Sequence, residues 1–524
     1  MLVFYIHQNT VKVCGSASQM AMLRTYLTVK TANAYFARKH RWESSIRFFG
    51  QIDKRFSYGL WGHVKYFLRD NDIKYKVISH RKRLPPLDTK ELGGVTLYKY
   101  QIQSCNAWFK RGGAGIIWGA PGFGKTEISC AIINQMLNRG YASKVLFVVN
   151  GLDLLDQAKL RIKDRLGLDA GSISGGDVRL NKIITVTAIQ KIHLLIKQKN
   201  PDILEFLSKI DLLVYDEVHH GRSSQTTLLV KNCDAKYRLG VSARPLRIDY
   251  NTYKTHDLDM MKADDARVIA TIGPTVKRVT ASQLIEINKL AKPSIYLYSL
   301  NFKDYRDPSF HGENMKWPDA KKKFVIENNV IHSVASKQAL QAAKTGQSTL
   351  VIAGGSRKLG LNVYHKMHDD NLNVVYLHGA IDKGFRARSR KRMIEGRLDA
   401  CVATTIYDEG IDIPNIRQLI LAYGGLSPMK NEQRLGRGLR NKVGANEVVV
   451  VDFIHYGNKH LRKHSYARLR MYLEENAYKV YLVGQHTPHV IRLVGKENIV
   501  DHLPDSHAFK ELKSDDKKHK TRDN

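Results

Sequence analysis

Apolar positions follow two alternating patterns along most of this chain. Short runs rich in Val, Ile and Leu are separated by longer segments whose apolar residues recur at helical spacing. The short runs predict buried strands and the longer segments predict helices that cover both faces of a parallel sheet. The first series of predicted strands is 114–118, 145–149, 183–186, 212–215 and 237–241. The second series is 349–352, 374–377, 400–403, 418–421 and 447–451. The chain is therefore expected to hold two α/β domains in tandem.

The first 95 residues have a different pattern, which predicts a small α/β module. Strands are expected at 2–6, 11–13, 45–49 and 75–78, and helices at 20–29 and 60–68. A basic, proline-containing stretch at 81–86 reads as a linker. The expected organisation is a basic N-terminal domain at 1–95, a first α/β domain at 96–250, a connector at 251–322, a second α/β domain at 323–475 and a C-terminal extension with a charged tail at 476–524.

Charge changes the picture by indicating a partner. The 524 residues include 84 Lys and Arg against 49 Asp and Glu, a formal net charge of +35. A charge of this size favours a polyanion, and nucleic acid is the preferred interpretation. The module at 1–95 holds 17 basic and 6 acidic residues, and its cations Arg47, Lys54 and Arg55 interleave with aromatic residues in a manner suited to DNA contact. The alternative is that most of the aromatic residues are core and about half of the charges are a solvated face.

Other compositional features exclude some classes of protein. The five cysteines are scattered and form no CxxC pair, so neither a zinc ribbon nor a disulfide framework is expected. No apolar run is long enough to span a bilayer, and the first residues lack the basic lead of a signal peptide. We therefore expect no membrane association and a cytoplasmic location.

The most informative stretch is residues 119–126, Gly-Ala-Pro-Gly-Phe-Gly-Lys-Thr. It follows a predicted strand and precedes a predicted helix, which is the context that a phosphate-binding loop requires. Its glycines allow backbone N–H groups to surround phosphate oxygens, and the helix N-terminus adds positive potential. The residues expected to bind ATP here are Gly119, Gly122, Gly124, Lys125 and Thr126. Lys125 can reach the β- and γ-phosphates, and the Thr126 hydroxyl can ligate Mg²⁺.

A second acidic motif completes this half of the site. Asp216 and Glu217 follow the predicted strand 212–215 directly. Asp216 can hold Mg²⁺ opposite Thr126, and Glu217 can orient and deprotonate the attacking water if it lies within hydrogen-bond reach. His219 follows closely. We expect it to couple the site to the next motif, although it could be an idle neighbour.

Taken together, the motifs over residues 96–475 resemble those of superfamily 2 helicases, in the order of that family. The resemblance implies two RecA-like domains, ATP hydrolysis and movement along nucleic acid. It implies that Gln101 recognises the adenine of ATP and that Gln157, Thr187 and Gln190 contact the nucleic-acid strand. His219, Ser242 and Ala243 would belong to the family's coupling motifs. Thr187 could equally be a cap residue, since Thr caps helices readily.

In the second domain the resemblance covers residues 403–414 and 433–440. Thr404 would contact nucleic acid, Gly410 and Asp412 would contact nucleotide, and Gln433, Arg437 and Arg440 would belong to the catalytic set. Two arginines at i and i+3 of one helix share a face, so Arg437 and Arg440 can both reach one phosphate and act as arginine fingers.

Further sequence resemblances point to one subgroup of the superfamily 2 helicases. Residues 273–293 resemble the inter-domain passage of the subgroup that includes the XPB and UvsW helicases. Residues 42–49 and 56–62 resemble the small DNA-binding domain of phage UvsW helicases, and 461–468 resembles the closing helix of their second domain. The family analogy implies a 3′→5′ DNA helicase acting on forks, Holliday junctions and R-loops in recombination, repair and replication.

Two departures from the family pattern affect the step mechanism. The family usually has Pro-Thr where this chain has Asn150-Gly151, and Thr where it has Arg244. Three alternatives stay open: a duplex translocase that does not separate strands, an RNA helicase, and a DNA-binding protein with a degenerate motor. Intact Lys125, Glu217 and Arg440 argue against the last of these.

Overall fold

The computed structural model describes residues 1–30, 45–174, 177–248, 250–258, 261–300, 312–404, 416–423, 434–436, 439, 446–484 and 490–493. The chain divides into two compact units, Met1–Val279 and Thr280–Asn524.

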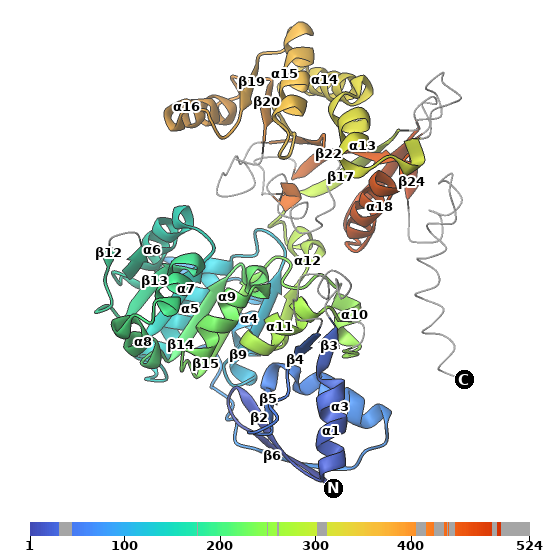
Figure 1. Ribbon diagram of the computed structural model, residues 1–524. Coiled ribbons are helices and arrows are strands. Elements are labelled where there is room, and N and C mark those ends of the chain that lie inside the picture. Colours follow the sequence, from blue (N-terminus) through green and yellow to red (C-terminus); the bar gives the residue numbers. More distant parts are fainter. Residues whose placement is uncertain are drawn as a thin grey trace. The chain divides into compact units, whose positions relative to one another are not determined.

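The first unit is built on an eight-stranded sheet with the order β12-β11-β13-β10-β14-β15-β9-β16 (Figure 1). All neighbouring strands run parallel except β12, which is antiparallel to β11. The strands are β9 (Ala114–Gly119), β10 (Val145–Val149), β11 (Gly171–Ser174), β12 (Asp177–Val178), β13 (Ile184–Ala188), β14 (Leu212–Asp216), β15 (Tyr237–Ser242) and β16 (Thr275–Val279). The five strands predicted for the first domain are confirmed, because covered parallel strands leave continuous apolar runs in the sequence.

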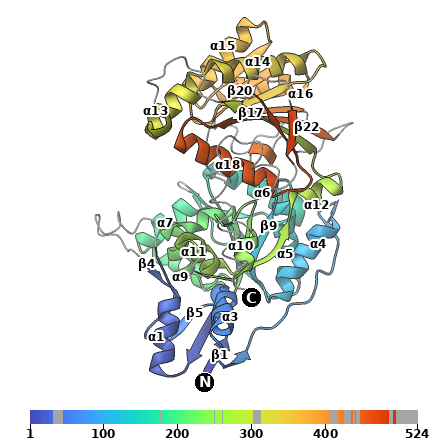
Figure 2. The ribbon, with the colours of Figure 1, turned by 90° about the vertical axis from the view of Figure 1, so that its right-hand side faces the viewer.

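Helices cover both faces of this sheet, as Figure 2 shows. On one face lie α4 (Lys99–Lys110), α5 (Lys125–Asn138) and α6 (Leu152–Leu166). On the other face lie α7 (Ile189–Lys197), α9 (Ser224–Lys231) and α11 (Ala263–Ile272). The shorter elements of this region are β7 (Glu91–Leu92), β8 (Val95–Thr96), α8 (Pro201–Ser208) and α10 (Tyr250–Lys254).

The N-terminal module contains a four-stranded sheet with the order β5-β2-β1-β6. Its elements are β1 (Leu2–Ile6), β2 (Thr10–Cys14), α1 (Ala17–Tyr26), β3 (Thr28–Lys30), β4 (Ser45–Arg47), β5 (Arg55–Ser57), α3 (Trp61–Asp70) and β6 (Tyr75–Ser79). The helix predicted over 20–29 is wrong at its end. Thr28 and Val29 are β-branched and pair with β4 as an antiparallel strand, so the helix stops at Tyr26.

The module does not fold apart from the domain that holds residues 119–126, here called the ATP-loop domain. The apolar cores of the two are continuous through α11. The backbone at Gly59 lies so close to the Ile269 carbonyl that a Cβ atom would come within 1.9 Å of its oxygen. A Cβ at Gly62 would be 3.1 Å from the His256 ring. Asn9 Nδ2 also donates to the Ala235 carbonyl at 3.0 Å. Residues 1–279 therefore form one packed unit.

The stretch expected to be a linker is fixed at its first residue. The Arg81 guanidinium donates to the carbonyls of Gln8 and Arg111, and it stacks 3.8 Å from the centre of the Tyr58 ring. Gln8 belongs to the module and Arg111 to the ATP-loop domain, so Arg81 joins the two. These contacts add to the direct packing through α11.

The second unit holds another eight-stranded sheet, with the order β19-β20-β18-β21-β22-β17-β23-β24. Only β24 is antiparallel to its neighbour. The strands are β17 (Lys292–Leu300), β18 (Thr349–Ile352), β19 (Val374–Leu377), β20 (Ala400–Ala403), β21 (Gln418–Leu421), β22 (Glu447–His455), β23 (Lys479–Val483) and β24 (Val490–Leu493). All five predicted strands of this domain are confirmed.

The segment 251–322, expected to be a connector, contributes to both sheets. It supplies β16 to the first sheet and β17 to the second, where β17 pairs with β22 over nine residues. The extension expected from 476 onward likewise supplies β23 and β24. Only alternate residues of β17 are buried. Lys, Ser and Tyr therefore alternate with apolar residues such as Ile and Leu, and the sequence resembles that of a polar loop.

The helices of the second unit are α12 (Ala281–Glu286), α13 (Trp317–Lys321), α14 (Asn329–Ala343), α15 (Arg357–Asp369), α16 (Lys383–Ile394) and α18 (Lys459–Leu473). A buried ion pair fastens α18 to β22: Arg468 Nε donates to Asp452 Oδ2 at 2.8 Å, and the Tyr472 hydroxyl donates to the same oxygen at 2.8 Å. This carboxylate also gives the Arg468 guanidinium a raised pKa despite full burial. The helix expected over 461–468 is thereby confirmed.

Candidate active site

The phosphate loop has the backbone that its glycines predict. Gly122 and Gly124 have φ angles of 88° and 80°, in the left-handed region that favours glycine. The buried Phe123 ring packs against Gly119, where a Cβ atom would lie 2.3 Å from the ring. Helix α5 then begins at Lys125. A loop of this shape ahead of a helix N-terminus fits the triphosphate of ATP.

The structure brings the loop lysine and the acidic motif together. The Lys125 ammonium pairs with Glu217 Oε1 and lies 4.0 Å from Asp216 Oδ1. Asp216 is the last residue of β14, and Glu217 has a left-handed backbone with φ of 51°. Such a conformation costs free energy in a residue that is not glycine, and the surrounding contacts must hold it. The Glu217 N–H donates to Asp216 Oδ1 at 2.9 Å.

Glu217 continues into a buried polar triad with His219 and Ser242. His219 Nδ1 lies 3.1 Å from Glu217 Oε2 and 3.0 Å from Ser242 Oγ. The Ser242 hydroxyl donates to Glu217 Oε2 at 3.2 Å. A carboxylate only accepts hydrogen bonds, so His219 carries its proton on Nδ1. The two predicted coupling residues thus contact the predicted base directly, and Ala243 follows them, buried, in the loop after β15.

Gln101 lies beneath the phosphate loop. Its Oε1 accepts from the Tyr98 N–H at 2.9 Å, and its Nε2 donates to the Phe123 carbonyl at 3.3 Å. The side chain is almost fully buried, and a Cβ at Gly124 would lie 2.2 Å from its Nε2. Gln101 therefore supports the loop, while its predicted contact with adenine stays a prediction.

The residues predicted to contact the nucleic-acid strand lie in different environments. Gln157 on α6 and Gln190 at the start of α7 are exposed, and Thr404 is buried just after β20. Thr187 is fully buried in β13, and its hydroxyl donates to the Ile173 carbonyl at 3.2 Å. The prediction that Thr187 contacts phosphate is therefore corrected, because its hydroxyl serves the sheet. Helices α6 and α7 both contact β13 from opposite faces of the sheet, and all five residues of β13 are buried.

The predicted contacts of the N-terminal module are exposed. Arg47, Lys54 and Arg55 all present their side chains to solvent. The described aromatic residues of this region pack inward instead, with Phe49 and Phe56 buried in the core. For these aromatic residues the alternative of a core role is confirmed.

Five predicted residues lie outside the described part of the chain. They are Gly410, Asp412, Gln433, Arg437 and Arg440. Among their described neighbours, Leu435 and Leu439 are buried, and the Arg434 guanidinium stacks 4.1 Å from the centre of the Tyr423 ring.

Some residues that position the site lie outside every sequence motif and could not be predicted. Asp265 at the start of α11 accepts hydrogen bonds from Arg222 Nε at 3.2 Å and from the N–H groups of Arg247 and Ile248 at 2.7 and 3.1 Å. Arg222 ends the short helix after the acidic motif, and Arg247 lies just after the Ser242 loop. Burial raises the pKa of Asp265 although Arg222 opposes that rise. Asp265 thereby ties together the segments that follow two site motifs.

Helix α16 is a second feature that the sequence analysis missed. Six of its twelve residues are Lys or Arg and none is acidic. Arg388, Lys391 and Arg392 are exposed, and Phe385 beside them is 38% exposed. Basic residues recurring within a single helix could have indicated this surface.

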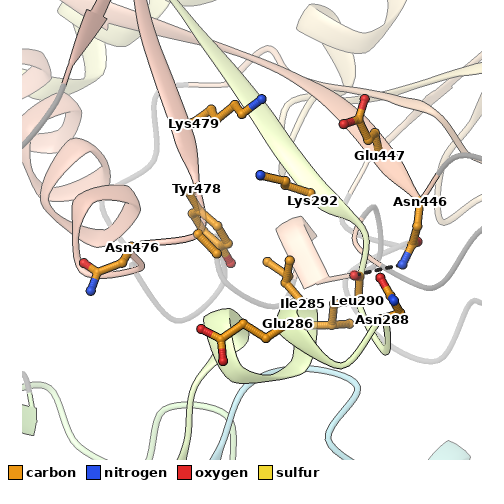
Figure 3. Close-up of a pocket in the computed structure, with 11 residues that line it drawn as sticks. Ile285, Glu286, Asn288, Leu290, Lys292, Asn446, Glu447, Asn476, Tyr478 and Lys479 are labelled. Carbon is orange, nitrogen blue, oxygen red and sulfur yellow. Dashed lines mark hydrogen bonds between the residues drawn. The ribbon is translucent and has the colours of Figure 1, made fainter.

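A pocket of about 500 Å³ lies elsewhere in the second unit, and Figure 3 shows its lining. Lys292, Glu447 and Lys479 stand at the amino ends of β17, β22 and β23. The predicted motifs of this domain follow the carboxyl ends of strands, so the pocket belongs to the opposite edge of the sheet.

The buried cysteine thiols contribute little chemistry. Cys105, Cys130, Cys233 and Cys401 are buried, and burial raises the pKa of Cys105 and Cys130 to about 12, as expected for idle thiols. Within the described ranges, no helix is long and apolar enough to cross a membrane.

Comparisons with known proteins agree with this geometry. The family model for the type III restriction enzyme res subunit matches residues 94–247, and that for the helicase conserved C-terminal domain matches residues 332–442. The DNA 3'-5' translocase XPB2 of Sulfurisphaera tokodaii is 26% identical over 427 residues, covering 76% of this chain and 89% of the relative. The ATP-dependent DNA helicase uvsW of Enterobacteria phage T4 is 21% identical over 467 residues, covering 84% and 88%.

A solved structure supports the fold alone. A fragment described as the HsdR subunit of a type I restriction enzyme from Vibrio vulnificus YJ016 has a TM-score of 0.54 at 15% identity, covering 75% of this chain and 70% of that chain. The two family models match in chain order, and the first covers the phosphate loop, the acid pair and the serine that contacts it. The chain therefore belongs to the superfamily 2 helicases and is an ATP-hydrolysing helicase or translocase.

Proposed function

We propose that this protein is an ATP- and Mg²⁺-dependent DNA motor that moves 3′→5′ and remodels branched DNA. Its substrates are forks, Holliday junctions and R-loops, in the service of recombination, repair and replication. The names of the two relatives support DNA as substrate, and that of XPB2 supports the polarity.

In the proposed hydrolysis cycle each site residue has a separate task. Lys125 leaves its ion pair with Glu217 to hold the β- and γ-phosphates, and Thr126 and Asp216 hold Mg²⁺. The release frees the Glu217 carboxylate to orient and deprotonate water, while His219 and Ser242 keep its second oxygen in place. Bound Mg²⁺ supplies neutralisation of the phosphate charge.

The second domain supplies the remaining groups in this proposal. Arg437 and Arg440 stabilise charge on the transferring phosphoryl group, and Gln433, Gly410 and Asp412 complete the nucleotide contacts. Arg440→Ala is accordingly expected to bind ATP and to lose most of its turnover. Full turnover of this variant would refute its assignment as an arginine finger.

The observation that carries the choice of branched DNA is the packing of the basic module on the ATP-binding domain. The module and the sheet share one core, and Arg47, Lys54 and Arg55 are exposed on the module. A fixed cationic surface beside a motor can hold one arm of a junction while the motor acts on another. The basic helix α16 offers a further cationic surface, on the second domain.

A second candidate is a translocase that moves along duplex DNA without separating strands. The printed name of XPB2 as a translocase favours it. An assay of ATP-driven fork unwinding and four-way junction processing, run beside displacement of a third strand from a triplex, separates the two functions. Processing of forks, junctions and R-loops supports our proposal. Triplex displacement with no strand separation supports the translocase.

Measuring ATP hydrolysis with DNA and with RNA tests which nucleic acid is the substrate. Measuring it in the Lys125→Ala variant tests whether the motor is active. We expect DNA, but not RNA, to stimulate ATP hydrolysis, and Lys125→Ala to abolish it. Stimulation by RNA alone would overturn the proposal in favour of an RNA helicase.

A further inference from the structure

Three loops on the first sheet meet at its carboxyl edge. Strand β10 lies between β13 and β14 in the sheet. Asn150 comes directly after β10, Gln190 two residues after β13, and His220 four residues after β14. Adjacent parallel strands place these residues at one edge of the sheet.

Hydrogen bonds join the three residues. Asn150 Nδ2 lies 2.9 Å from His220 Nε2, and Gln190 Nε2 donates to the Asn150 carbonyl at 3.3 Å. The amide nitrogen of Asn150 is only a donor, so His220 Nε2 is the acceptor in this contact. The asparagine therefore contacts one neighbour through its side chain and the other through its backbone.

His220 lies close to Glu217, the predicted base. Its N–H donates to the Glu217 carbonyl at 3.0 Å, and its ring centre lies 4.0 Å from that of His219. His219 in turn contacts Glu217 Oε2 at 3.1 Å. Contacts through His220 thus connect the Asn150 amide to the Glu217 segment.

We propose that Asn150 is a positioning residue that couples nucleic acid bound at the Gln190 surface to Glu217. The inference rests on the proposed function, which makes Gln190 a DNA contact. When DNA contacts the Gln190 side chain, the hydrogen bond from Gln190 to the Asn150 carbonyl changes. The Asn150 side-chain amide then shifts relative to His220, to which it is hydrogen-bonded. The family's usual proline at this position has no side-chain donor, so the Asn150 departure creates the link.

The test compares ATP turnover with and without single-stranded DNA in the full chain. For Asn150→Ala we expect the ratio of stimulated to unstimulated turnover to fall about tenfold, within the usual range of coupling between sites. The DNA concentration that gives half-maximal stimulation should stay near that of the wild type, because Asn150 does not itself bind DNA. His220→Ala should give the same loss, and the double variant should lose no more than either single one.

Two further variants separate coupling from damage to the fold. His220→Gln keeps an acceptor for the Asn150 amide and should retain most of the stimulation, whereas His220→Ala should not. Asn138→Ala removes an exposed amide at the end of α5 that donates to Asn134 Oδ1 at 3.3 Å. It is the matched control and should match the wild type in both turnover values. Thermal unfolding of each variant confirms that it is folded.

The outcomes distinguish this inference from the proposed function. Wild-type stimulation in Asn150→Ala, or losses that multiply in the double variant, would overturn the coupling alone. A wild-type chain whose turnover DNA leaves unchanged would overturn the proposed function together with the coupling.

Discussion

At the scale of single residues, Glu217 is where conformation and chemistry meet. Its left-handed backbone turns the chain away from β14, so its carboxylate faces Lys125 on one side and His219 and Ser242 on the other. One oxygen of the carboxylate is paired with the ammonium and the other is held by the triad. The carboxylate is therefore oriented by several groups before any substrate is considered.

Replacing Glu217 tests its assignment as the base. Glu217→Gln keeps the shape of the side chain and removes the proton acceptor, so we expect ATP turnover to fall by about 10²–10⁴-fold. ATP affinity should change little, since Lys125 and the phosphate loop are intact. Steady-state hydrolysis and nucleotide titration measure the two quantities. The control is Glu205→Gln on α8, an exposed side chain that pairs with Lys209. Near-normal turnover of Glu217→Gln would assign the base elsewhere.

Which site residues could be predicted depended on whether a local pattern marks them. Lys125, Asp216, Glu217 and Ser242 lie in motifs whose spacing fixes their place on successive loops, and the structure brings them together. Asp265 could not be found, because one acid in an amphipathic helix has no local signature. Thr187 misled for a related reason: the sequence cannot show which face of a doubly covered strand a hydroxyl takes.

At the scale of elements, α18 is fastened to β22 by charge inside the core. Arg468 and Asp452 are each about 1% exposed, and the Tyr472 hydroxyl shares the same carboxylate. Burial and the carboxylate raise the pKa of Tyr472 well above its ordinary value. A buried pair of this kind adds little when intact, but the loss of one partner leaves the other charge uncompensated.

Arg468→Ala should therefore destabilise the second unit by about 3–5 kcal/mol. Denaturant unfolding, followed by hydrogen exchange in peptides of residues 446–484, measures the effect. Arg470→Ala, an exposed arginine on the same helix, is the matched control and should stay within about 0.5 kcal/mol of the wild type. Equal stability of both variants would contradict the role given to the buried pair.

Helix α16 carries a prediction about DNA affinity. Arg388→Glu with Arg392→Glu reverses two exposed charges, so DNA binding should weaken and the slope of log affinity against log salt should fall by about two. The control is Lys337→Glu with Lys344→Glu, two exposed lysines on and just after α14 with the same total change in charge. Equal losses in both variants would mean that only net charge matters.

Elements were predictable in proportion to how completely they are covered. Most of the ten predicted strands are buried on both faces and were found because their runs are mainly apolar, whereas β19 was found although only alternate residues are buried. Strand β17 was missed because only alternate residues face the core, and Lys, Ser and Tyr occupy the other positions. Its nine-residue pairing with β22 is a long-range contact that no local pattern reveals.

At the scale of the whole molecule, each unit contains a histidine that is buried as a neutral ring. Burial, with His256 nearby, lowers the pKa of His63 to about 3, and burial beside Arg468 does the same for His455. Neither ring nitrogen of His63 has a hydrogen-bond partner among the described residues. Unfolding lets each ring take up a proton near its ordinary pKa of 6.5.

Both units should therefore lose stability as the pH falls below about 6.5, and each histidine should contribute about 1.4 kcal/mol per pH unit until about pH 3. The stability is fully present above pH 6.5, because the folded-state pKa is depressed. Hydrogen exchange of peptides from each unit at pH 4–7 measures the effect. His63→Leu should flatten the dependence in the first unit only, and His455→Leu in the second only. An unchanged slope would contradict the neutral state.

The close packing at Gly59 and Gly62 has a mechanical consequence. A module that shares a core with the ATP-binding domain, with no room for even a methyl group at Gly59, has no joint about which to swing. Any rotation of that domain carries the module with it as a lever arm. The exposed cations Lys54 and Arg55 then travel along an arc that lengthens with their distance from the axis of rotation. A small angular change at the nucleotide thus becomes a larger sweep of the surface that we propose holds DNA.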